Sequence, residues 1–384
     1  MHAVHSAWRE NFFISGLGPV SRRQSALSQN AIKLTYNPAL DGMRAVAILM
    51  VILSHAHAPM FDGAFFGVDL FFVLSGYLIT SLLLKEMHAN EGRIDFWQFF
   101  RRRFYRLMPP LLLFLGAYCL IAPWVWPELD DIYSDSLVSA LYLADYGIAF
   151  FDMPDTLLHM WSLSVEEHFY LIWPFVLWWI ASRTTADKLW RYIGLLFLVG
   201  WAWRVFWVAM GQEFYEVFFR FDTRTTGLLL GSMLSALVIS QHSVLGRLQN
   251  QLPRLMWLPL AVPWLMMLEW GDMEAMVWGL TLVEFASFAI LLSVLPGKGL
   301  IFDMLSSPAL VKIGQLSYGI YLWHYPIVRW LRAEFAWPVA VVLGFALSTL
   351  MAAISYRTIE RWAMKRRDAK PSPHQQKPTA TSSS

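Results

Sequence analysis

The 384-residue sequence has little charge and almost no cysteine. Cys119 stands alone, so no intramolecular disulfide can form. Charged side chains make up 15% of the chain, whereas soluble domains contain about 25%. From Leu107 to Ser182 there is no Lys or Arg at all. These shortages exclude a disulfide-stapled secreted domain and argue against a soluble protein, and a net charge of +2 gives no sign of a nucleic-acid partner.

Apolar residues are in surplus instead: 57% of the chain is hydrophobic, with 20 Trp and 27 Phe. Aromatic side chains are enriched at membrane interfaces, and a spanning helix needs about 20 mostly apolar residues. The sequence therefore predicts an all-α polytopic membrane protein of about ten transmembrane helices. The ten predicted spans are 43–60, 65–84, 106–124, 163–182, 191–210, 225–241, 254–269, 275–295, 315–333 and 337–357.

The distribution of Lys and Arg predicts how the chain crosses the membrane, because cytoplasmic loops are the basic ones. With ten spans and both termini in the cytoplasm, the outer segments hold only Arg220, Arg224, Arg329 and Arg332. We expect a bacterial inner-membrane protein with a cytoplasmic tail at 1–36, not a signal peptide, a transmembrane domain at 37–362 and a disordered cytoplasmic tail at 363–384. Segment 137–151 is expected to form a re-entrant or surface helix on the outer side, and no fused soluble domain is expected.

Ionisable residues inside predicted spans are candidate site residues, because burying them in lipid is costly. Arg44 and His55 are eleven residues apart, which places them on one helix face and about 16 Å apart along the axis. Membrane topology alone would also explain Arg44. Asp69, in the next span, could pair with His55 and orient its imidazole, or could lock the two helices together.

The arginine cluster before the third span suggests an anionic ligand. Arg103 and Arg106 share a helix face at i, i+3, and two guanidiniums can grip a phosphate or pyrophosphate. No GxxxxGK[ST] or GxGxxG motif is present, so neither a P-loop nor a dinucleotide-binding fold is supported. No HExxH or CxxC motif occurs either, and we expect no metal.

The outer side of the predicted bundle carries further polar residues. His159, Glu166 and Glu167 stand where the fourth span begins, and Glu166 follows His159 by two helical turns. Arg220 and Asp222 precede the sixth span. His324 lies in the ninth span among aromatic residues, a setting in which a histidine is more often structural than catalytic.

Five stretches resemble acyltransferase family 3, a family of integral-membrane O-acyltransferases. They run in order from about Leu40 to Arg361 and are "LDGMRAVAILMVILSH", "FFGVDLFFVLSGYLIT", "RRRFYRLMPP", "WSLSVEEHFYLIWP" and "LSYGIYLWHYPI". The second stretch is the most specific of them. The resemblance implies a ten-helix membrane domain that moves acyl groups, usually acetyl, from cytoplasmic acyl-CoA to hydroxyls of glycans or lipid-linked sugars. It also implies that some members carry an extracytoplasmic domain, so a separate periplasmic partner is a further expectation here.

Residues and resemblance together predict three roles. His55 is expected to be the general base, with Asp69 or Glu166 orienting it, and an acyl-histidine intermediate stays open. The donor would be held by Arg44, Arg103 and Arg106, with no cofactor resident in the protein. The acceptor, a surface glycan or lipid-linked glycan reached among membrane lipids, would be bound by His159, Arg220, Asp222 and His324. The main alternative is a proton-coupled secondary transporter, against which stands the lack of an inverted repeat.

Overall fold

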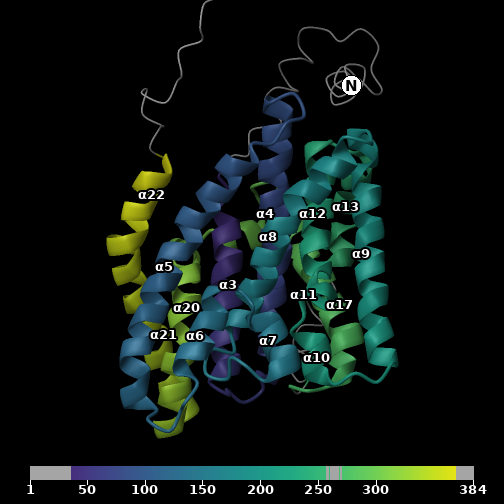
Figure 1. Ribbon diagram of the computed structural model, residues 1–384. Helices are drawn as coiled ribbons and strands as arrows, with labels where there is room; N and C mark the ends of the chain where they lie inside the picture. The colour runs from purple at the N-terminus through teal and green to yellow at the C-terminus, as the bar shows by residue number, and fades with distance from the viewer. Residues whose placement is uncertain (1–35, 257–258, 260–267, 269, 369–384) are drawn as a thin grey trace, which may run out of the picture.

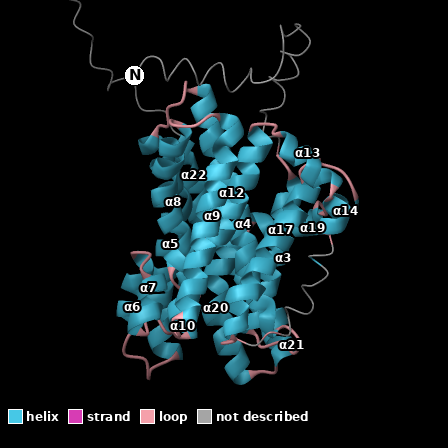
Figure 2. Ribbon diagram, turned by 90° about the vertical axis from the view of Figure 1, so that its right-hand side faces the viewer, coloured by secondary structure: helices cyan, strands magenta, loops and turns pink. Residues whose placement is uncertain are grey.

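The computed structural model describes residues 36–256, 259, 268 and 270–368, and helices are the only regular elements in this part of the chain (Figures 1 and 2). The α-helices are α3 (Pro38–His55), α4 (Gly67–Ala89), α5 (Phe96–Val125), α6 (Ile132–Ala140), α7 (Ala144–Phe151), α8 (Met160–Ala181), α9 (Ala186–Ala209), α10 (Phe214–Phe218), α11 (Phe221–Arg224), α12 (Thr226–Ile239), α13 (Ser243–Asn250), α14 (Leu252–Leu255), α17 (Leu280–Val294), α18 (Leu300–Leu305), α19 (Pro308–Gln315), α20 (Ser317–Glu334), α21 (Trp337–Ser355) and α22 (Arg361–Asp368). A 3₁₀ turn, Asp62–Phe66, precedes α4, and π-helical turns at Ala275–Gly279 and Tyr356–Glu360 precede α17 and α22.

Local capping explains where two site helices begin. Asn37 caps α3 by accepting a hydrogen bond from the Ala39 N–H, and Pro38 occupies the first turn, where its missing N–H costs nothing. Asp95 caps α5 through the Gln98 N–H, so the helix begins at Phe96, ten residues before the predicted start of this span. The arginine cluster expected before the third span therefore lies within α5 itself.

Six helical segments of the described residues are long and apolar enough to cross a membrane, and a seventh results if the bent α12–α13 pair is one span. The predicted count of ten is not confirmed. Both α8 and α20 have the length, but α8 carries Glu166, Glu167 and His168 and α20 carries two arginines. Helix α12 has only 14 residues, and most of predicted span 254–269 lies outside the described residues. Which end of the bundle faces the cytoplasm stays a prediction.

Helix α4 is buried between its neighbours and packs most extensively on α12. A Cβ added to Gly76 would lie 1.8 Å from the carbonyl oxygen of Leu228, and one added to Gly231 would lie 2.0 Å from that of Val73. Such close backbone contact requires glycine, as in other membrane helix pairs. The hydroxyls of Thr80 and Ser81 on α4 bond those of two serines on α12, which fixes the register of the pair.

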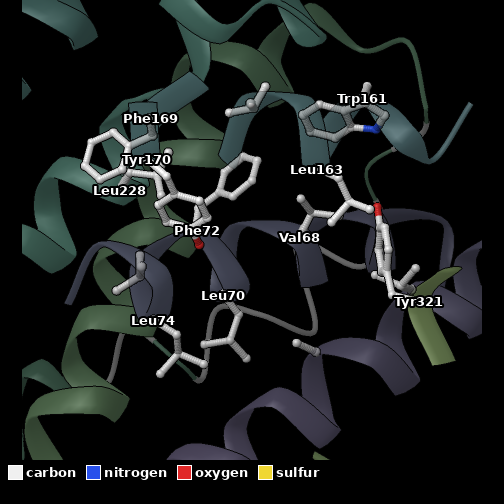
Figure 3. Packing of buried hydrophobic residues seen from close by; sticks show 14 of the residues in the cluster. Val68, Leu70, Phe72, Leu74, Trp161, Leu163, Phe169, Tyr170, Leu228 and Tyr321 are labelled. Carbon is white, nitrogen blue, oxygen red and sulfur yellow. The ribbon is translucent and has the colours of Figure 1, made fainter. Parts of the chain in front are cut away.

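The opposite faces of α4 meet different parts of the core. Figure 3 shows Val68 pointing toward Leu163 of α8 and toward Tyr321, while Leu70 and Leu74 point away from them. All five of these side chains are buried. One face of α4 thus packs toward α8 and Tyr321 of α20, and other faces pack on α3, α12 and α17.

Segment 137–151 folds as parts of two short helices, α6 and α7, which pack against α5 and α8 at one end of the bundle (Figure 1). Tyr142 lies between them with a positive φ of 55°. At the C-terminus, α22 continues to Asp368, beyond residue 363, where we expected disorder to begin. The remainder of that predicted tail, and all of the predicted N-terminal tail except Tyr36, lies outside the described residues.

Candidate active site

A chamber of about 610 Å³ lies inside the bundle, lined by residues of α3, α4, α5, α8 and α20 among others. Its volume is in the range of small-molecule sites, about 300–1,000 Å³. Four of the predicted site residues line it: Arg44, Arg103, Arg106 and Glu166. The structure thus brings the three predicted donor-binding arginines, which come from two helices, to one cavity.

The three arginines differ in how far their charge is already balanced. Arg44 makes an ion pair of 3.0 Å with Asp41, one turn earlier on α3. The Arg103 guanidinium lies 3.4 Å from the centre of the Tyr170 ring and 3.6 Å from a Glu167 carboxylate oxygen. Arg106 is exposed to the chamber and has no ion pair or hydrogen bond among the described residues. It is therefore the arginine most available to a bound anion.

Glu166 enters the chamber from α8 and accepts a short hydrogen bond, 2.6 Å, from the Ser75 hydroxyl of α4. It was predicted as one of two acids that could orient His55. The hydrogen bonds formed by His55 and Glu166 do not join the two residues. The orienting role is thus not seen in this structure, because Glu166 is held against Ser75 on another helix.

Three histidines from three parts of the chain meet beyond one wall of the chamber. The Nδ1 atom of His55 is 3.0 Å from the Nε2 atom of His324, and the His159 and His324 rings lie with centres 5.3 Å apart. Tyr321 stands between this histidine cluster (His55, His159 and His324) and the chamber: it lines the chamber, and its ring centre is 5.1 Å from that of His324. The histidine cluster therefore lies next to the chamber across the Tyr321 ring, and the predicted base, His55, is joined to that ring through His324.

Pro326 explains how His159 is held. Proline has no N–H, so the carbonyl four residues earlier, that of Leu322, loses its usual helix partner. The Nε2 atom of His159 donates to this carbonyl at 3.2 Å. Its Nδ1 atom is buried without a partner among the described residues. The motif "LWHYP" thus creates the anchor for a histidine more than 150 positions away in sequence.

The end of α3 is fixed by Arg332 of α20, which donates to the carbonyl of His55 at 3.0 Å and also bonds the His57 ring. His57 lies just past the helix, and burial together with the nearby Arg332 charge lowers its pKa below the ordinary value. A neutral His57 can accept the Arg332 hydrogen bond. This contact holds the helix terminus that carries His55.

The predicted pairing of Asp69 with His55 is wrong. The Asp69 carboxylate accepts from the Arg224 guanidinium at 3.0 and 3.2 Å, with both side chains 1% exposed. This ion pair joins α4 to α11, and its arginine lies over the rings of Phe218 and Trp161. Asp69 thus locks helices together, as the alternative predicted, but its partner is Arg224, which the sequence did not indicate.

The predicted acceptor-binding residues Arg220 and Asp222 bond each other instead of lining the chamber. The Arg220 Nε atom donates to Asp222 at 2.9 Å, and the Trp203 indole donates to the same carboxylate at 2.6 Å. Arg220 also lies 4.9 Å from the Trp207 ring centre. Any part in acceptor binding stays a prediction for this pair.

A second buried ion pair was not assigned a role from the sequence. Arg204 of α9 is 3.4 Å from Glu284 of α17, and Thr226 of α12 bonds both. The signal was present, since an arginine within a predicted span requires an acidic or polar partner. The partner could not be chosen from the sequence, because it lies 80 residues away.

The helices and the chamber define a multi-pass membrane protein with an internal polar cavity whose walls carry arginines and an acid, beside a histidine cluster. Residues 37–357 match the family model described as an acyltransferase domain. The chain therefore belongs to acyltransferase family 3. No solved structure matches it.

Curated relatives are named as O-acetyltransferases. The "O-acetyltransferase OatA" of Staphylococcus aureus is 31% identical over 342 residues, covering 85% of this chain and 57% of the relative. The "Putative peptidoglycan O-acetyltransferase YrhL" of Bacillus subtilis is 32% identical over 353 residues, covering 85% and 54%. The chain thus spans a little more than half the length of the curated relatives it matches.

Proposed function

We propose that this protein is a membrane O-acyltransferase that moves an acyl group, acetyl in the first instance, from acyl-CoA to a glycan hydroxyl. One observation carries the proposal: three arginines and Glu166 line a chamber that adjoins a histidine cluster, in a member of acyltransferase family 3. The arginines suit the phosphates of the donor, and the histidines suit proton transfer to and from the reacting groups.

The donor would enter the chamber at the end that carries Arg44 and Arg106. Coenzyme A has a pyrophosphate and a 3′-phosphate, and the unpaired charge of Arg106 would bind one of them. Arg103, whose guanidinium is fixed by Tyr170 and Glu167, would add a second positive charge to the donor site. The thioester end would then reach toward Tyr321 and the histidine cluster, consistent with the axial offset of about 16 Å between Arg44 and His55.

His55 would act as the general base. The acceptor oxygen forms a bond to the thioester carbonyl carbon while its proton passes to the imidazole. The carbon–sulfur bond then breaks, and the proton goes to the leaving CoA thiolate. An imidazole can accept a proton on one ring nitrogen and later release it, which suits both transfers.

The acceptor class follows from the relatives. One of them is named for peptidoglycan, and we extend a cell-surface or lipid-linked glycan acceptor to this chain. In a bacterial inner membrane, the donor would come from the cytoplasm and the acceptor from the outer face, with or without a separate periplasmic partner. No comparison supports the alternative of a proton-coupled carrier.

The proposal is tested with purified protein in lipid nanodiscs, by following CoA thiol release from acetyl-CoA in the presence of peptidoglycan fragments. His55→Ala is expected to lower the rate by about 10²–10⁴-fold, the usual contribution of a general base. His57→Gln is the matched control, because it keeps an acceptor for Arg332 and lies outside the histidine cluster. Native rates in a folded His55→Ala protein would end the base assignment, and absence of acetyl transfer in the wild type to any glycan tested would count against the acceptor class.

A further inference from the structure

His324 is fully buried in α20 and uses both ring nitrogens in hydrogen bonds. Its Nδ1 atom is 2.6 Å from the carbonyl oxygen of Tyr321, one turn earlier on the same helix. Its Nε2 atom is 3.0 Å from the Nδ1 atom of His55 at the end of α3. The three groups therefore form a continuous chain of hydrogen bonds from the α20 backbone to the proposed base.

The Tyr321 carbonyl determines which nitrogen donates in each of these hydrogen bonds. A carbonyl oxygen can only accept, so the Nδ1 atom of His324 must carry the proton. In a neutral ring, its Nε2 atom then accepts, and the His55 Nδ1 atom must donate to it. A charged His324 would need a compensating anion, yet its ring neighbours are His55, His159, Tyr321 and Tyr325. Burying an uncompensated charge is far more costly than burying the neutral ring.

We propose that His324 is a positioning residue that fixes His55 in the Nδ1–H tautomer. The Nε2 atom of His55 is then left with a free lone pair, which is the form a general base requires. When this atom takes a proton from the acceptor hydroxyl, the Nδ1–H bond to His324 persists and orients the imidazolium. The inference rests on the proposed function, because it assigns a role through His55.

The surroundings hold this histidine pair in place. The Tyr321 hydroxyl donates to the carbonyl of His159 at 2.9 Å and shares a hydrogen bond with the Ser162 hydroxyl. Arg332 holds the carbonyl of His55 from the same helix that carries His324. Because both rings are tied to α20, their relative geometry survives small movements of α3. His324 thus performs for His55 the orienting role that the sequence assigned to Asp69 or Glu166.

Two substitutions of similar size separate the positioning role from a merely structural one. The side-chain carbonyl of His324→Gln can reach the place of the Nε2 atom and accept from His55. His324→Asn can still donate to the Tyr321 carbonyl, but it is too short to reach His55. We expect kcat of His324→Asn to fall about 100-fold with an unchanged KM for acetyl-CoA, and His324→Gln to stay within about tenfold of the wild type. Wild-type kcat in His324→Asn, or equal losses in both folded variants, would overturn the proposal.

The tautomer of His55 can also be measured directly, independently of activity. In wild-type protein labelled with ¹⁵N-histidine, the His55 signals are identified by their loss in His55→Ala. We expect a protonated Nδ1 and an unprotonated Nε2 at neutral pH, and a protonated Nε2 would refute the positioning role of His324. If His55→Ala is inactive while His324→Asn is normal, only the positioning role of His324 fails. If His55→Ala keeps its activity, the proposed base fails, whatever tautomer is found.

Discussion

Removing the Asp69 carboxylate tests whether the Asp69–Arg224 pair holds the bundle together. Both side chains are 1% exposed, and a single Arg224 nitrogen donates to both carboxylate oxygens. The other two guanidinium nitrogens have no partner among the described residues. Asp69→Ala would remove the carboxylate that bonds this buried guanidinium, which would be left against the rings of Phe218 and Trp161.

The expected magnitude comes from this burial. Removing one partner of a buried ion pair costs about 3–5 kcal/mol, because the other charge stays buried and unpaired. The Arg329–Asp155 pair provides the matched control, since its distance is similar, 3.2 Å, while its side chains are 27% and 69% exposed. Exposed pairs contribute about 0–1 kcal/mol, so Asp155→Ala is expected to change stability by no more than that.

The assay is reversible unfolding in mixed micelles by titration with sodium dodecyl sulfate, followed by circular dichroism. The double variant Asp69→Ala with Arg224→Met should recover most of the lost stability, because it removes both charges and fills the site with an apolar chain. A loss in Asp69→Ala as small as that of the exposed control would refute the reasoning. So would a double variant that is less stable than the single one.

Two further substitutions test the packing and the donor site. Gly76→Ala would place a Cβ 1.8 Å from the Leu228 carbonyl oxygen, so we expect a loss of about 1–3 kcal/mol or more in the same unfolding assay. The control Gly116→Ala meets open space and should be neutral or slightly stabilising. Equal effects of the two substitutions would contradict the close-packing argument. Arg106→Ala is expected to weaken acetyl-CoA binding at least tenfold by titration calorimetry, because it removes an unpaired positive charge from the chamber. Arg102→Ala, outside the chamber, should leave the affinity unchanged. Unchanged affinity in Arg106→Ala would show that Arg106 does not belong to the donor site.

The sequence predicted much of the candidate site within individual helices. Arg103 and Arg106 were placed together from their spacing, and both line the chamber. This prediction depends on the helical repeat alone, which is a local property of the chain.

Partners on different helices were predicted less well. Asp69 was matched to the histidine of the neighbouring span, but its partner Arg224 is 155 positions away. His324 was assigned to acceptor binding, yet it bonds His55 across 269 positions. The periodicity of one span does not indicate which neighbour it faces in a bundle of many helices.

The sequence by itself determined the helical membrane character, the positions of most long helices and, through five ordered motifs, the family. The helical character and the helix positions follow from apolar length and local spacing, which act within one segment, whereas the family follows from the resemblance of the motifs. The tertiary structure alone decided which ionisable groups became partners and which of them face the chamber. Helix rotation and glycine-mediated packing set those contacts, and the cost of burying unpaired charge explains why Asp69 and Arg224 meet inside the bundle.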